Sequence, residues 1–317
     1  MPIEQNQNFS RTTLRLKAWI ALFRPPNLFT VPGDPLAGVL LAASAQHVTP
    51  SWNSVYAVMG AALAFYASGL LANDFFDRNI DARERPSRPI PSGAVKPNTV
   101  KWGAILLSLT GLLLSLAASH ITFAVGLLLA LAIWYYNAFG KKIAWLAPFS
   151  MGICRGLSLT LGASVLGMGG ITTHSVLIAA FFLTLFIALI TMVARYEATP
   201  EANPLSNWSR WGIPILLTIW LMLFLFKAGS TTELQWKSLS VMMTVMSVLW
   251  AIIWTGQMKP HAPARVIQSS VGNLIRGLLF TQAALCTSYG GTGEGFALGL
   301  LFLFPVSGWI GKWFYGS

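Results

Sequence analysis

Four oxygen-bearing side chains, Asn73, Asp74, Asp77 and Asp81, have a spacing that predicts one shared helix face. Asn73, Asp77 and Asp81 follow each other at i, i+4 and i+8, and Asp74 precedes Asp77 by three positions. Three carboxylates stacked in this way without interposed cations repel one another, so a divalent cation among them makes the arrangement favourable. Magnesium prefers oxygen ligands and commonly binds one or two carboxylates together with substrate phosphates. The spacing predicts a magnesium-bridged diphosphate site, with the three aspartates as catalytic residues and all four side chains as ligands.

Arginines follow the acidic residues directly and predict binding of the same diphosphate. Arg78, Arg85 and Arg88 lie within or just beyond the predicted helix, and a guanidinium can donate two parallel hydrogen bonds to a phosphate. Pro86 is expected to end the helix. The alternative is a solvated, mixed-charge helix end, but aligned aspartates at a membrane boundary are costly without a partner.

The elements that must position these residues are membrane helices. The chain has 317 residues, of which 55% are hydrophobic and only 10% charged, whereas soluble domains carry about 25% charged residues. Apolar runs close to the roughly 20 residues that cross a bilayer recur from Leu28 onward. Unbroken runs such as Ile178–Val193 favour helices, because barrel strands alternate. We expect an all-α membrane protein of nine or ten transmembrane helices, the weakest segment being Val271–Tyr289.

Basic residues alternate between connections and predict the orientation. They gather in Arg78–Lys101, Lys141–Lys142, Arg195–Arg210 and Lys259–Arg265, which the positive-inside rule places in the cytoplasm with the N-terminus. This distribution explains the net charge of +11 without a nucleic-acid partner. We expect a multi-pass protein of the cell (inner) membrane, with active-site loops facing the cytoplasm.

The N-terminal residues 1–27 are expected to be cytoplasmic and to include an amphipathic helix on the lipid headgroups. That helix covers Arg11–Phe23, in which basic residues alternate with apolar ones. Residues 28–317 form the predicted transmembrane domain.

The acidic motif and its flanks resemble those of a known family. Asn73–Asp81 matches the NDxxDxxxD signature of UbiA-type intramembrane prenyltransferases, Arg85–Gly93 matches the RPxRPIPSG run that follows it, and Arg24–Asn27 is similar to the RPxN start of their first span. The resemblance implies Mg²⁺-dependent transfer of a prenyl group from an allylic diphosphate to an aromatic or hydroxyl acceptor. It also implies a central cavity opening to the cytoplasmic face, and a substrate-binding role for Asn27.

The family's second aspartate pair has no aspartate counterpart in this chain. Glu197 and Glu201 occupy the corresponding stretch at i, i+4 and could act as ligands, with Arg195 beside them on the substrate, although Pro200 disfavours a shared helix face. The alternative is that Glu197 pairs with Arg195 or another cation and that Glu201 is solvated. The missing aspartates keep a second function open, a non-catalytic UbiA-like component that binds or exports a lipid or metabolite.

Further polar residues are candidate substrate ligands. Tyr136 followed by Lys141 and Lys142 is similar to a tyrosine–lysine element of the family, with a spacing one residue longer; the alternative is that the lysines only set topology. Arg155 lies inside an apolar segment, where an arginine indicates a functional site with a carboxylate or phosphate partner. Asp34, in the first span, is either a buried functional residue or a boundary group. The patterns around Arg155 and Glu197 look like a divergent UbiA-like branch linked to bacterial secondary-metabolite genes.

Overall fold

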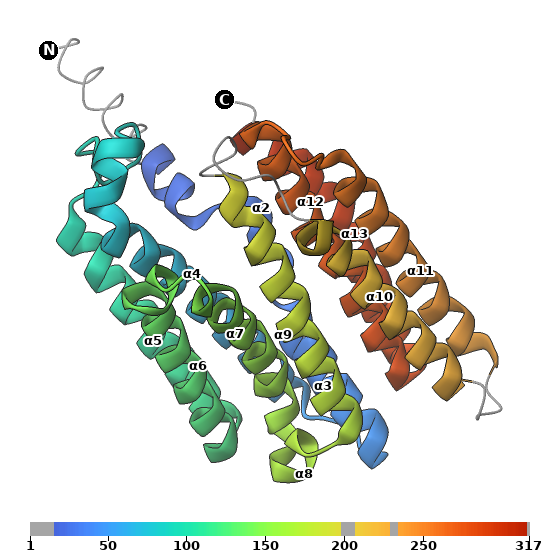
Figure 1. Ribbon diagram of the computed structural model, residues 1–317. Coiled ribbons are helices and arrows are strands. Elements are labelled where there is room, and N and C mark those ends of the chain that lie inside the picture. Colours follow the sequence, from blue (N-terminus) through green and yellow to red (C-terminus); the bar gives the residue numbers. More distant parts are fainter. Residues whose placement is uncertain (1–15, 198–206, 229–233, 316–317) are drawn as a thin grey trace, which may run out of the picture.

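The computed structural model describes residues 16–197, 207–228 and 234–315, and within them it contains helices and no strands (Figure 1). The helices form a bundle in which long helices run side by side. They are α2 (Pro25–Leu28), α3 (Gly33–Gln46), α4 (Trp52–Glu84), α5 (Pro97–Ala118), α6 (His120–Ala138), α7 (Leu146–Ala163), α8 (Gly167–Ile171), α9 (His174–Ala194), α10 (Asn207–Ala228), α11 (Leu234–Gln257), α12 (Ala264–Cys286) and α13 (Gly291–Tyr315).

Among the described residues, eight helical segments are long and apolar enough to cross a membrane, and a shorter apolar stretch covers Arg210–Leu223. The predicted all-α membrane class is confirmed. The segment predicted as Val271–Tyr289 is helix α12, which begins earlier, at Ala264, and is not among the eight. Helix α12 packs against α3, α11 and α13. Because neighbouring helices cover much of it, α12 can carry polar side chains that a lipid-facing helix could not.

Helix α4 is longer than a membrane span needs to be, and the acidic motif lies in its C-terminal turns. Its 33 residues give a length of about 50 Å at 1.5 Å per residue, against a hydrocarbon core of about 30 Å. It ends at Glu84, two residues before Pro86, as expected. The surplus length places the C-terminal turns of α4, and their acidic face, at one edge of the bundle.

Helices α3 and α7 are in very close contact because glycines face each other's backbone. A Cβ atom at Gly162 would lie 1.8 Å from the carbonyl oxygen of Pro35, and one at Gly38 would lie 2.0 Å from that of Leu159. Small residues allow such approach between membrane helices. The contact brings the N-terminal half of α3 beside the C-terminal end of α7.

The chain before α2 packs onto the region around the end of α4. Residues 16–23 are helical, and Trp19, Leu22 and Phe23 contact an apolar cluster that includes Leu71 and Ile90. The predicted amphipathic helix Arg11–Phe23 falls partly outside the described residues, so its position on the headgroups stays a prediction. At the end of this segment Arg24 adopts a left-handed backbone conformation, with φ of 45°, which non-glycine residues adopt rarely.

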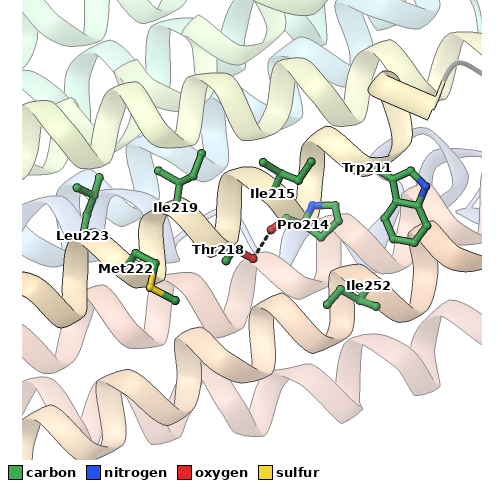
Figure 2. A pocket seen from close by; sticks show the side chains of 8 residues that line it. All are labelled: Trp211, Pro214, Ile215, Thr218, Ile219, Met222, Leu223 and Ile252. Atoms are coloured by element: carbon green, nitrogen blue, oxygen red, sulfur yellow. Dashed lines mark hydrogen bonds between the residues drawn. The ribbon is translucent and has the colours of Figure 1, made fainter.

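An apolar groove of about 810 Å³ runs along α10 and α11 (Figure 2). Seven of its eight lining residues come from α10, among them Trp211, Ile215 and Met222, and Ile252 comes from α11. Its lining contains no charged side chain. The groove therefore lacks the groups that could bind a diphosphate.

Candidate active site

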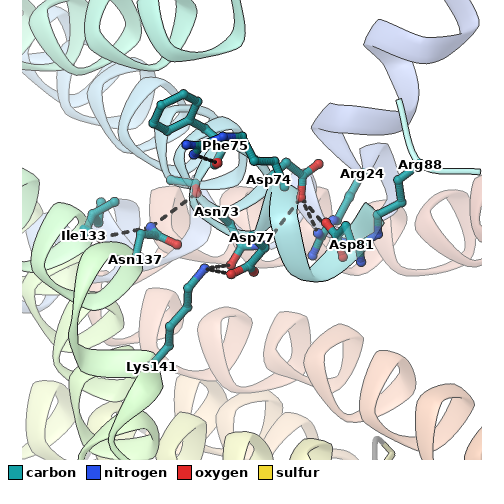
Figure 3. Close-up of polar contacts among 12 residues, drawn as sticks. Arg24, Asn73, Asp74, Phe75, Asp77, Asp81, Arg88, Ile133, Asn137 and Lys141 are labelled. Atoms are coloured by element: carbon teal, nitrogen blue, oxygen red, sulfur yellow. Dashed lines mark hydrogen bonds and ion pairs between the residues drawn. The ribbon is translucent and has the colours of Figure 1, made fainter. Parts of the chain in front are cut away.

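The acidic residues lie in the C-terminal turns of α4, and each of the three aspartates contacts a basic side chain. Asp74 and Asp81 are buried, with 6% and 5% of their surfaces exposed, while the Asp77 side chain is 24% exposed. Figure 3 shows Asp74 and Asp81 facing Arg24 and Arg88, and Asp77 facing a lysine from a different part of the chain.

Two arginines join the outer aspartates. Arg24 Nη2 lies 3.1 Å from Asp74 Oδ1, and Arg88 Nη1 lies 3.6 Å from the same oxygen and 2.7 Å from Asp81 Oδ2. Arg88 thereby links two turns of α4 to the loop that follows, and Arg24 links them to the chain before α2. These guanidinium groups gather where a diphosphate is predicted to bind.

Lys141 supplies the third cation. It lies in the 3-10 helix η1 (Gly140–Lys142), and its Nζ is 2.7 Å from Asp77 Oδ1 and 3.1 Å from Asn73 Oδ1. Burial lowers the pKa of the Lys141 ammonium below its ordinary value, and the hydrogen bond and charge of Asp77 oppose that change. Lys142 is exposed, and its Nζ lies 6.0 Å from the centre of the Phe139 ring. The structure thus separates two lysines that are equivalent in the sequence.

If the predicted diphosphate is the substrate, we expect Lys141→Met to lower kcat/KM for it by about 10- to 100-fold, the equivalent of one hydrogen bond to a charged group. The neighbouring Lys142→Met is the matched control and should stay within about twofold of the parent enzyme, since a surface cation contributes little. Initial rates at varied diphosphate concentration measure both. Equal losses in the two variants would contradict the assignment of Lys141 to the site.

The ion pairs correct the repulsion argument drawn from the spacing. The three aspartates do have cations beside them, and two of these, Arg24 and Lys141, come from distant parts of the sequence. Stacked carboxylates alone therefore do not require a metal. What supports a metal is the donor set, because the carboxylate oxygens of the three aspartates and the amide oxygen of Asn73, which are buried or partly buried, are of the kind that magnesium binds together with water and phosphate oxygens. The described residues hold no group of three or more His, Cys, Asp or Glu close enough to bind an ion by themselves.

Other predicted residues lie at varied positions. Arg78 turns away from the acidic face, donating to the Phe75 carbonyl oxygen at 2.7 Å and lying over its ring. Arg195 donates to the Ala144 carbonyl oxygen, and Arg85 is exposed. Glu197 is the last residue of η3 (Arg195–Glu197), and Glu201 lies outside the described residues. A binding role for each of these stays a prediction.

A second polar layer lies deeper in the bundle. Tyr66 is seven residues before Asn73 on α4, two helical turns along the same face. It interacts with the side chain of Asn27 and lies within electrostatic range of Arg24 and Arg155. Tyr136 lies within the same kind of range of Arg24 and Asp77. Asn27 and Arg155 therefore lie around Tyr66, two turns deeper than the acidic residues, while Tyr136 lies nearer to Asp77. Tyr66 is not among the predicted site residues.

Arg155 has the carboxylate partner that its position predicts. Its Nε lies 3.0 Å from Asp34 Oδ2, and Gln282 Nε2 donates to Asp34 Oδ1 at 2.6 Å. Arg155 Nη2 and Gln282 Nε2 both donate to the Thr30 carbonyl oxygen. Arg24, Tyr66 and Gln282 are the participants that sequence reasoning missed; the signal for Gln282 is an amide inside an apolar segment.

Several archaeal enzymes are similar in sequence. The chain is 30% identical over 171 residues to the digeranylgeranylglyceryl phosphate synthase of Methanosarcina mazei, covering 51% of this chain and 59% of that one. It is 29% identical over 196 residues to the enzyme of the same name from Ignicoccus hospitalis, covering 60% and 62%. The chain thus spans less than two thirds of the length of these relatives.

Solved structures share the fold. A UbiA homologue from Archaeoglobus fulgidus bound to GPP and Mg²⁺ superposes with a TM-score of 0.61 at 16% identity, covering 88% of this chain and 99% of that one. The apo structure of a UbiA homologue from Aeropyrum pernix K1 gives 0.57 at 12% identity, with 81% and 96% covered.

The resemblance of the acidic motif is confirmed over most of the bundle. The model of the UbiA prenyltransferase family matches residues 35–255, a range that contains α4 with its acidic face, Lys141 and Arg155. With the motif, the helical bundle and the sequence match in agreement, the chain belongs to the UbiA prenyltransferase family.

Proposed function

We propose that the chain is a magnesium-dependent prenyltransferase that moves a prenyl group from an allylic (poly)prenyl diphosphate to an aromatic or hydroxyl acceptor within the membrane. The observation that carries the proposal is the acidic face of α4, where Asp74, Asp77 and Asp81 meet cations from three separate segments. Membership of the family, and relatives named as prenyl-lipid synthases, support it.

Two groups of residues would bind the diphosphate, one through the metal and one directly. Asn73, Asp74, Asp77 and Asp81 would hold Mg²⁺, which supplies Lewis-acid stabilisation of the leaving group when bound. Arg24, Arg88 and Lys141 can turn from the carboxylates toward phosphate oxygens and stabilise the charge that develops there. The C1–O bond of the substrate breaks with its electron pair on the diphosphate. A bond then forms between C1 and the acceptor, and the acceptor proton passes to the released diphosphate.

The surrounding bundle shields the allylic cation. Tyr66 and Tyr136 lie below the acidic face, where aromatic rings stabilise a cation through their π faces and apolar helices keep water away. The prenyl chain extends between helices toward lipid. The site opens through a central cavity to the cytoplasm, in line with the basic connections. Residues 1–27 form a cytoplasmic segment, and residues 28–317 are the transferase domain of an inner-membrane protein.

A second candidate function is non-catalytic binding or export of a lipid or metabolite. The ion pairs favour it, because Asp74, Asp77 and Asp81 are each already neutralised by a cation. Glu197 and Glu201 stand where the family has its second aspartate pair. Product formation distinguishes the two functions.

The deciding experiment uses purified protein in nanodiscs, radiolabelled allylic diphosphates of several chain lengths and a membrane extract as the acceptor source. We expect a labelled, magnesium-dependent lipid product for at least one chain length. Absence of product at every chain length, with magnesium present, would favour the non-catalytic function.

Removal of the metal gives a further prediction. Chelation with excess EDTA should abolish product formation, and added Mg²⁺ should restore it, because the carboxylates and diphosphate are expected to share the ion. The rate is measured before chelation, after it and after metal addition. A product yield that does not change with EDTA would contradict the magnesium assignment.

A further inference from the structure

Asp34, Arg155, Gln282 and Thr30 form a buried polar cluster between three helices. Their exposed fractions are 0%, 9%, 2% and 1%. Asp34 comes from α3, Arg155 from α7 and Gln282 from α12, so the cluster joins elements far apart in the sequence. A Cβ atom at Gly33 would lie 2.3 Å from Gln282 Oε1, which shows how closely the amide is fitted. Arg155 is thus held in one position by its partners.

Arg155 has donors that its protein partners leave unused. Its guanidinium offers five N–H groups, and the contacts made by the described residues are those of Nε with Asp34 and of Nη2 with Thr30. No acceptor in the described part of the chain contacts Nη1. The Arg155 side chain keeps 10% of its surface accessible. A buried guanidinium with unused donors needs a further acceptor, because unpaired buried donors are costly.

The cluster lies at the depth where the two substrates would meet. Tyr66 is on the acidic face of α4, about 10 Å closer to the middle of the membrane than Asn73 at 1.5 Å per residue. It is within electrostatic range of both Arg24, which binds Asp74, and Arg155. When the diphosphate occupies the acidic face, the prenyl C1 atom and the acceptor that attacks it lie below, on the side of Tyr66 and Arg155.

The net charge of the buried cluster around Arg155 favours an uncharged acceptor group over an anionic one. The Arg155 guanidinium is paired with the Asp34 carboxylate at 3.0 Å, so the pair is neutral, and Thr30, Gln282 and Tyr66 add no charge. A second anion placed there would be buried without a cation of its own, which is strongly unfavourable. An uncharged oxygen can accept a hydrogen bond from Arg155 without that cost.

We infer that Arg155, positioned by Asp34 and Gln282, binds an uncharged hydroxyl or phenol oxygen of the prenyl acceptor, so that the acceptor is a neutral lipid-like alcohol or phenol and not a phosphorylated one. The inference rests on the proposed transferase function. It separates this chain from the relatives named as synthases of a glyceryl phosphate lipid.

Two pairs of acceptors that differ by one phosphate test it: 1-dodecylglycerol and its phosphate monoester, and 4-dodecylcatechol and its monophosphate. The donor is radiolabelled geranyl diphosphate with Mg²⁺. The parent enzyme should prenylate the neutral member of a pair with at least tenfold higher kcat/KM. Asp34→Asn keeps the shape of the side chain and removes its charge, so Arg155 becomes an uncompensated cation. The preference should then shift toward the phosphate by tenfold or more.

The double variant Asp34→Asn/Arg155→Gln removes both charges together, which avoids leaving one of them buried alone. Its acceptor KM should rise by roughly tenfold, the equivalent of one lost hydrogen bond to a charged group, while the Kd for geranyl diphosphate and the unfolding temperature stay close to those of the parent. Lys101→Gln, which removes an exposed cation elsewhere, should change none of these values.

The outcomes separate the two proposals. Three results would overturn the neutral-acceptor inference, provided that the parent protein binds geranyl diphosphate: preferred use of the phosphate monoesters, an unchanged preference in Asp34→Asn, or no product from any of the four acceptors. The transferase proposal would then depend on the membrane-extract assay. Failure of the parent protein to bind geranyl diphosphate or to form product in that assay would overturn the transferase proposal itself.

Discussion

Asp77→Asn should lower the rate of prenyl transfer by about 10²- to 10³-fold, the loss typical when one preorganised electrostatic contact to a reacting group is removed. Asp77 is the most accessible aspartate of the acidic face, with 24% of its side chain exposed, and its Oδ1 lies 2.7 Å from Lys141 Nζ. The amide has nearly the same shape, so the change removes charge and leaves packing intact. Single-turnover rates with radiolabelled allylic diphosphate and saturating Mg²⁺ measure the effect.

Glu84→Gln is the matched control for this substitution. It also converts an acid to its amide on α4, at the exposed last residue of the helix, three positions beyond Asp81. We expect its rate to stay within about twofold of the parent, because an isolated surface charge contributes little. Full activity of Asp77→Asn would contradict the assignment of the acidic face to diphosphate binding. An equal loss of activity in Glu84→Gln would indicate that removing any negative charge from this end of α4 lowers the rate.

Gly162→Val should destabilise the bundle more than any single change at the acidic face. Its Cβ atom would lie 1.8 Å from the carbonyl oxygen and 2.6 Å from the Cα atom of Pro35. These are backbone atoms, so no rotamer change can relieve the clash and α3 must move away from α7. Overpacking of a well-packed core typically lowers the free energy of unfolding by about 1–3 kcal/mol. Because the clash here is with backbone atoms, we expect a loss at or above the upper end of that range. Because Asp34 precedes Pro35, the same shift would pull Asp34 away from Arg155.

Thermal unfolding in detergent, followed by tryptophan fluorescence and by the fraction of monodisperse protein, measures this prediction. Gly299→Val makes the identical substitution inside α13, where a Cβ atom would meet no other atom within 4 Å. Its unfolding temperature should match that of the parent, since substitutions at open positions usually change stability by less than about 0.5 kcal/mol. Equal unfolding temperatures for the two variants would contradict the close contact between α3 and α7.

The acidic face bears on the prediction that this chain lacks the second aspartate pair of the family. Three cations, Arg24, Arg88 and Lys141, already lie beside the three aspartates. In the proposed complex with a diphosphate, these cations would provide positive charge that a metal would otherwise supply. If the chain binds a diphosphate as we propose, these cations would neutralise part of its charge without a second aspartate pair, and Glu197 and Glu201 are the acidic residues in the corresponding stretch.

The amino-acid sequence by itself determined the membrane class, the helical architecture and the acidic face of α4. These properties depend on local patterns: apolar length sets the spans, and the spacing of Asn73, Asp77 and Asp81 follows the helical repeat. Pro86 marks the helix end in the same local way. The prediction of magnesium and diphosphate binding also came from residue types that can be read along a single helix.

Only the tertiary structure decided which cation meets which carboxylate. Arg24 and Asp74 are 50 positions apart, and Asp34 and Gln282 are 248 apart, so no periodicity connects them. Lys141 and Lys142 are adjacent in the sequence, yet one binds Asp77 and the other is exposed, because the direction of each side chain in η1 depends on how α6 and α7 pack against α4. Long-range pairing depends on the packing of whole helices, and that packing arises from many contacts, such as Gly162 against Pro35, that no local pattern encodes.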